Sequence, residues 1–118
     1  MSGGKGSQSK GREAELALAK ELRERLGIPG IRAGKPASFG READIVGVPG
    51  LHIEVKRHER LALPEWIEQS ERDSVRLNDG FPTVIFRRNR EPWRICLRLD
   101  HFLRIYKCAL GGNKNGKT

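Results

Sequence analysis

The first hydrophobic pattern of the chain predicts a helix over residues 10–26. Apolar side chains recur at every fourth position from Ala14 to Leu26, with strong helix formers between them. Gly27 and then Pro29 follow directly, and this combination is typical of the end of a helix. The N-terminal part of the chain is therefore expected to contribute one amphipathic helix.

One acid of this helix, Glu15, has an unusual position. It precedes Leu18, Ala19 and Leu22 by three, four and seven residues, so its carboxylate should point inward at the edge of the apolar face. Two interpretations are open at this point. Glu15 is either a surface glutamate paired with a lysine or arginine, or a functional acid.

Two short β-branched runs on either side of a Pro-Gly turn predict a β-hairpin over residues 43–56. From Leu51 onward the side chains alternate between two faces. Leu51, Ile53 and Val55 form the apolar face, and His52, Glu54 and Lys56 form the polar one. A single Glu-x-Lys pattern of this kind is also what the solvent face of an amphipathic strand looks like.

The turn decides where the acid at the start of the hairpin lies. If residues 48–50 form the loop and Gly50 takes the left-handed position, Asp44 lies opposite Glu54, and the two carboxylates share one face. A two-residue loop would instead place Asp44 on the other face.

Two directly opposed carboxylates, with Cβ atoms roughly 5 Å apart, repel each other unless a cation lies between them. Carboxylate oxygens are the ligands that Mg²⁺ prefers, and Mn²⁺ is expected to substitute for it. Lys56 lies on the same face, where its ammonium could stabilise the charge of a phosphoryl transition state. The hairpin thus predicts a divalent-cation site with an adjacent lysine.

The remaining segments complete an α/β pattern. We expect a strand over 28–34, an exposed basic loop over 35–41, a helix over 64–78, strands over 83–86 and 93–99, and a helix over 100–106. Trp66, Val75 and Leu77 are among the apolar positions of the second helix, and Phe102, Leu103 and Ile105 should pack the last helix as a lid. This order predicts a mixed β-sheet with helices on its faces.

The length of 118 residues allows one domain, expected over 10–108, between a disordered basic tail over 1–9 and a second disordered tail over 109–118. Lysine and arginine number 23 against 15 acids, which gives a net charge of +8 and favours a polyanionic partner, with nucleic acid before a membrane surface. No apolar run is long enough to span a membrane, and no signal core is evident. We expect a cytoplasmic protein of a bacterial, archaeal or phage-infected cell.

The residues expected to contact DNA are mostly basic and lie in loops and at element ends. The basic turn over 87–90 could hold a phosphate, although a solvated hairpin tip carries the same charges. The complete set is Lys10, Arg12, Lys35, Ser38, Arg41, Arg57, Arg60, Arg87, Arg88 and Arg90.

Several of these residues together resemble a known family. Lys10-Gly11 followed by Glu15, then Ser38, Asp44 and Glu54-Val55-Lys56, resemble the archaeal and phage Holliday junction resolvases of the PD-(D/E)XK nuclease superfamily, over about residues 10–106. The resemblance implies a restriction-endonuclease-like fold. It also implies a Mg²⁺ site of Glu15, Asp44 and Glu54, with Lys56 assisting phosphodiester hydrolysis. Gln69 resembles the helix glutamine of some branches of the superfamily.

The leading hypothesis is therefore a Mg²⁺-dependent endonuclease that resolves four-way DNA junctions. A PD-(D/E)XK nuclease for another DNA structure is one alternative, and a non-catalytic nucleic-acid-binding module is another. A complete set of inward acids with a lysine favours the enzyme, because a binding module does not need it.

Resolution of a four-way junction requires two nicks, so the resemblance also favours a symmetric homodimer acting on branched DNA. Large apolar side chains in the last third of the chain could form the interface, or they could complete the core of one subunit. They are Phe81, Trp93, Phe102, Leu103 and Tyr106.

Overall fold

The computed structural model describes residues 2–35 and 41–116, with side chains described for 11–35 and 41–111. Its elements follow the expected order: helix, three strands, helix, two strands and helix. They are α1 (Ser2–Leu26), β1 (Arg32–Ala33), β2 (Ile45–Val46), β3 (Leu51–Arg57), α2 (Leu63–Leu77), β4 (Phe81–Arg87), β5 (Arg94–Leu97) and α3 (Leu99–Gly116).

The strands form one five-stranded sheet in the order β1-β2-β3-β4-β5. The two central strands, β3 and β4, are parallel and are joined through α2, whereas all other neighbours are antiparallel. A parallel pair needs such a crossover, and a helix is its usual form. The predicted α/β fold, a mixed sheet flanked by helices, is confirmed.

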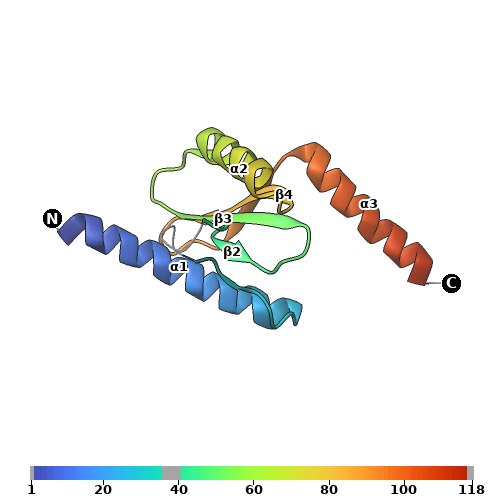
Figure 1. Cartoon of the computed structure of the whole chain (residues 1–118), viewed down its shortest axis with the longest axis horizontal. Coiled ribbons are helices and arrows are strands. Elements are labelled where there is room, and N and C mark those ends of the chain that lie inside the picture. Colours follow the sequence, from blue (N-terminus) through green and yellow to red (C-terminus); the bar gives the residue numbers. More distant parts are fainter. Residues whose placement is uncertain (1, 36–40, 117–118) are drawn as a thin grey trace.

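Helices α1 and α2 cover opposite faces of the sheet (Figure 1). On the α1 side, Ala14 and Leu18 pack with Ile53 and Val55 of β3 in the main core. On the α2 side the cluster around Trp66 is smaller. Strand β3 is therefore buried on both faces, and its polar residues lie beneath α2 instead of facing solvent.

The hairpin between β2 and β3 has the predicted register. Ile45 pairs with Ile53, and this pairing sets Asp44 opposite Glu54. Gly50 has φ +83°, the left-handed value that the three-residue loop requires. The interpretation with Asp44 and Glu54 on one face is therefore correct, and the two-residue loop is excluded.

The turn between α2 and β4 packs closely against this hairpin. Asn78 caps α2 in the left-handed conformation, and the Phe81 amide donates to the Gly50 carbonyl at 2.8 Å. Gly80 has φ +128°, and a Cβ there would come within 2.6 Å of the Gly50 backbone. This contact fixes Asp79 above the start of β3.

Two expectations about apolar side chains were wrong. Val75 is 80% exposed, because the inward stripe of α2 consists of Trp66, Ser70, Asp73 and Ser74 at helical spacing, and Val75 lies off it. The last helix is not a lid. It projects away from the sheet (Figure 1), and Phe102 and Leu103 are exposed along it.

The element bounds also differ from those expected. Helical backbone extends into both segments predicted as tails, because α1 begins at Ser2 and α3 ends at Gly116. Once a helix is nucleated, each added residue contributes a hydrogen bond, so an end can extend through residues with weak helix propensity. The strand expected over 28–34 is reduced to β1, and the strand expected over 93–99 to β5. Within the described residues, no helix is both long and apolar enough to cross a membrane.

Candidate active site

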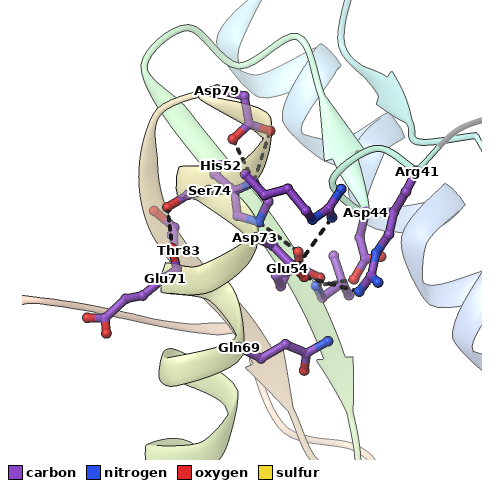
Figure 2. A network of polar contacts seen from close by, with 12 residues as sticks. Arg41, Asp44, His52, Glu54, Gln69, Glu71, Asp73, Ser74, Asp79 and Thr83 are labelled. Atoms are coloured by element: carbon purple, nitrogen blue, oxygen red, sulfur yellow. Dashed lines mark hydrogen bonds and ion pairs between the residues drawn. The ribbon is translucent and has the colours of Figure 1, made fainter.

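The two acids of the hairpin lie between α1 and α2 (Figure 2). Asp44 directly precedes β2, and its Oδ2 accepts a hydrogen bond of 2.8 Å from the Val55 amide of β3. The side chain thus takes the place of a backbone carbonyl at the end of the β2–β3 ladder. Glu54, one residue before Val55, is 6% exposed. A backbone amide of β3 therefore holds the Asp44 carboxylate, and Glu54 is buried beside it.

Helix α1 brings Glu15 to the same location from the other side of Asp44. Glu15 keeps 21% of its side chain exposed and pairs with Arg12, whose Nη1 lies 3.3 Å from Glu15 Oε1. Arg12 Nη1 also donates to the Gly34 carbonyl at 2.8 Å. Glu15 therefore pairs with an arginine and also faces the other acids, and its role as a functional acid stays a prediction.

The raised pKa values of Glu15 and Asp44 indicate that the three acids interact. Burial, and then the charge of Glu54 with a contribution from Glu15, raise the pKa of Asp44 to about 8. Burial also raises the pKa of Glu15, although the hydrogen bond and charge of Arg12 oppose the shift. A raised carboxyl pKa means that the ionised form is costly there. A divalent cation would remove this cost, and an all-carboxylate set of oxygens fits Mg²⁺.

Lys56 lies on the same β3 face, two residues beyond Glu54. Its Nζ donates to Gln69 Oε1 of α2 at 3.2 Å. The amide of Gln69 therefore holds the ammonium without neutralising its charge. The structure brings together all five residues expected at the site: Glu15, Asp44, Glu54, Lys56 and Gln69.

The sequence analysis missed three polar residues next to this group. His52 is completely buried, and Asp73 is 8% exposed. Asp79 is hydrogen-bonded to His52, with its Oδ1 2.8 Å from His52 Nδ1. The alternation along β3 already placed His52 beside Glu54, and Asp73 follows Gln69 by one helical turn.

His52, Glu54 and Asp73 have possible ligand atoms within 4.8 Å of one another and form a second candidate for a cation. The chain itself already neutralises this group. Arg41 Nη2 lies 3.2 Å from Asp73 Oδ2, and Arg76 Nη2 lies 3.4 Å from Asp73 Oδ1. Arg12 is the one arginine in an ion pair with the acids around Asp44 among the described residues, so the set of Glu15, Asp44 and Glu54 stays our prediction for the cation ligands.

The residues expected on DNA are distributed over several elements and loops of the described part of the chain. Arg57 and Arg87 are neighbours in the β3–β4 register, and Arg87 stacks on Trp93 at 4.7 Å. Arg88 pairs with Glu91 at 3.0 Å. Of the remaining predicted residues, Lys35, Arg60 and Arg90 are exposed, Arg12 and Arg41 are in the ion pairs described above, and Ser38 and the Lys10 side chain lie outside the described residues.

A protein family described as "Phage putative PDDEXK endonuclease" matches residues 6–109 of the chain. The chain belongs to this PDDEXK endonuclease family. The sequence therefore encodes a nuclease of the PD-(D/E)XK type, as the resemblance indicated.

Among solved structures, this PDDEXK chain is similar to Archaeoglobus fulgidus Hjc, a Holliday junction resolvase from an archaeal hyperthermophile. The two share 28% sequence identity with a TM-score of 0.50, over 75% of this chain and 72% of Hjc. No curated protein matches the chain in sequence. The likeness to Hjc confirms the restriction-endonuclease-like fold.

The carboxylate repulsion predicts how a cation affects stability. A ligand at 100 times its dissociation constant stabilises a folded protein by about 2.7 kcal/mol. Mg²⁺ should therefore raise the melting temperature of the wild type by several degrees, and it should raise that of Asp44→Asn much less. The introduced side-chain amide keeps an oxygen for the Val55 N–H, so the variant should fold, and without Mg²⁺ it should be at least as stable as the wild type.

Thermal denaturation with and without Mg²⁺ measures this difference. Glu68→Gln, which changes an exposed acid of α2, is the matched control and should behave as the wild type. Equal Mg²⁺ shifts in the wild type and in Asp44→Asn would show that the cation binds elsewhere.

Proposed function

We propose that this nuclease is a Mg²⁺-dependent endonuclease that cuts branched DNA, with the four-way junction as its preferred substrate and Mn²⁺ as a substitute cation. One observation carries the proposal: the hairpin register places Asp44 opposite Glu54, with Lys56 following on the same face. The junction preference rests on the likeness to Hjc, which is a Holliday junction resolvase.

The residues divide the work of phosphodiester hydrolysis between them. Glu15, Asp44 and Glu54 would hold the divalent cation. When bound, such a cation supplies positive charge at the phosphoryl oxygens and makes water a stronger nucleophile. Lys56 adds a second positive charge, which stabilises the negative charge that develops on the phosphate. Gln69 positions Lys56 through their hydrogen bond.

The surface supports a polyanionic substrate. The net charge is +8, and several predicted DNA contacts have no ion-pair partner among the described residues. They are Lys35, Arg57, Arg60, Arg87 and Arg90. Cations that are not already paired gain most from a phosphate, since no internal ion pair has to break. Arg88 and Arg41 must first leave Glu91 and Asp73, so we expect them to contribute less to binding.

We also propose that the enzyme acts as a symmetric homodimer. One subunit has one set of acids, and two nicks on a four-way junction need two. The exposed apolar side chains of α3 offer a surface for the second copy, because a soluble monomer rarely exposes so much contiguous apolar surface.

A cleavage assay on four-way junction, linear duplex and single-stranded DNA of matched sequence tests the substrate preference. With Mg²⁺ the junction should be cut in preference to the duplex and the single strand, and without a divalent cation none should be cut. Faster cleavage of the duplex would identify a PD-(D/E)XK nuclease for another DNA structure. Binding of all three without cleavage in Mg²⁺ or Mn²⁺ would contradict the enzymatic role.

A further inference from the structure

Three side chains form a continuous polar chain beneath α2, from the turn after that helix to the candidate cation site. They are Asp79, His52 and Glu54 (Figure 2). We propose that His52, held by Asp79, is a positioning residue that orients the Glu54 carboxylate for cation binding. This inference rests on the proposed function, in which Glu54 is a ligand.

The distances make His52 the connection between the two acids. Its Nε2 lies 2.7 Å from Glu54 Oε2, and its Nδ1 lies 2.8 and 2.9 Å from the two Asp79 oxygens. His52 is 0% exposed, so no water competes for either ring nitrogen. With Asp79 engaging one nitrogen, the ring can present only the other to Glu54.

The fold builds this chain from local features. His52 and Glu54 are two residues apart on β3 and therefore share a face. Asp79 comes from the α2–β4 turn, which the close contact of Gly80 with Gly50 fixes over the start of the strand. The backbone that carries Asp79 is therefore held in place by packing.

The consequence for Glu54 is a fixed carboxylate. A glutamate has three rotatable bonds, and anchoring one oxygen removes most of that freedom before a cation arrives. Glu54 Oε2 contacts His52, whereas no N–H donor among the described residues reaches Glu54 Oε1. The neighbouring cationic side chains are engaged elsewhere, since Lys56 bonds to Gln69 and Arg41 to Asp73. His52 is therefore the hydrogen-bond partner that orients Glu54.

Residues that orient a metal ligand change metal affinity by about 10–100-fold when they are replaced. The experiment measures Mn²⁺ binding to the full chain without DNA, by the loss of the free-ion electron paramagnetic resonance signal. Asp79→Ala removes the acceptor for His52 and should weaken Mn²⁺ binding at least about tenfold. Asp79→Asn keeps an acceptor oxygen and should retain most of the affinity.

His52→Phe should lose affinity to the same extent, and combining it with Asp79→Ala should cost no more than either alone, because both act through one carboxylate. Asp79 is partly exposed, so its variants should fold and can decide the test if His52→Phe does not fold. In cleavage assays Asp79→Ala should lower kcat and leave the KM for DNA unchanged. Glu68→Gln is the control for general effects on α2.

Two results would overturn the proposal. Unchanged Mn²⁺ affinity in a folded Asp79→Ala would mean that the contacts from Asp79 through His52 to Glu54 are purely structural. Loss of one bound Mn²⁺ per chain in His52→Phe, with a second still bound, would make His52 a ligand together with Asp73. Because the readout uses no DNA, a failure of the junction preference leaves it intact, whereas a wild type that binds no Mn²⁺ would contradict the proposed cation dependence itself.

Discussion

Glu54→Gln should reduce cleavage of a four-way junction by at least about 10²–10³-fold, the scale on which loss of one essential electrostatic group acts. Binding should remain at wild-type strength or become tighter, because the substitution removes a buried anion that repels phosphate. The amide has nearly the same shape as the carboxylate and still reaches His52, so the fold should survive. Cleavage and binding should therefore separate in this variant.

Single-turnover cleavage and gel-shift titration, both with Mg²⁺ at saturation, measure the two effects. Lys56→Ala should lose most activity as well, since it removes a charge next to the same acids, and its half-buried position makes folding tolerant of the change. Glu68→Gln should cut normally. If Glu54→Gln retains cleavage within a few-fold of the wild type, the cation site lies elsewhere.

The sequence was sufficient to predict the centre of the fold because strand alternation and turn chemistry are local. Gly50 and the three-residue loop predicted that Asp44 lies opposite Glu54, and the structure confirms this register. The stop at Gly27 likewise ended α1 where expected, and α2 ends within one residue of the predicted bound at 78. Each of these features is decided within a few residues of the chain.

The polar residues around the acids could not be predicted in the same way, because they meet only through the crossover. His52 lies on β3, Asp73 on α2, and Asp79 in the turn that follows. Their contacts depend on how α2 packs over the sheet. Helical periodicity gave Val75 an apolar role, yet the inward face of α2 carries Ser70 and Asp73, since it covers the polar side of β3.

The prediction for the last helix was wrong for the same reason. The helix is amphipathic as predicted, but periodicity does not say whether its apolar face packs on the sheet of the same subunit or on another surface. The pattern predicted a lid on the sheet, whereas among the described side chains it is the first part of the helix that contacts the sheet region, where His101 stacks on Phe81 at 4.8 Å. The rest of the apolar face lies away from the core.

The exposed apolar face of α3 predicts that two copies of the chain associate through this helix. Leu99, Phe102, Leu103, Tyr106 and Leu110 follow at helical spacing along one side of α3, and each is at least 45% exposed. Of the residues first expected at an interface, Phe102, Leu103 and Tyr106 are on this stripe, whereas Phe81 and Trp93 are half-buried in the subunit. Two such stripes packed together would bury the apolar core that a stable interface needs.

At micromolar concentration the wild type should sediment as a dimer of the 13.3 kDa chain. Leu103→Glu should make it monomeric, because two introduced charges would lie at the symmetric contact without compensation. Leu103 is 51% exposed in the single subunit, so the variant should keep its fold and its melting curve. Val75→Glu places the same charge on an exposed apolar position of α2, and it should remain dimeric.

Cleavage of the junction gives the functional counterpart. Wild-type subunits should nick both strands within one binding event, whereas Leu103→Glu should give single nicks. Mixed dimers of wild-type and Glu54→Gln subunits should also stop after one nick, because only one of their two sites is complete. A monomeric wild type on junction DNA, or paired nicks that survive mixing with excess Glu54→Gln, would contradict the dimer, since each subunit would then act alone.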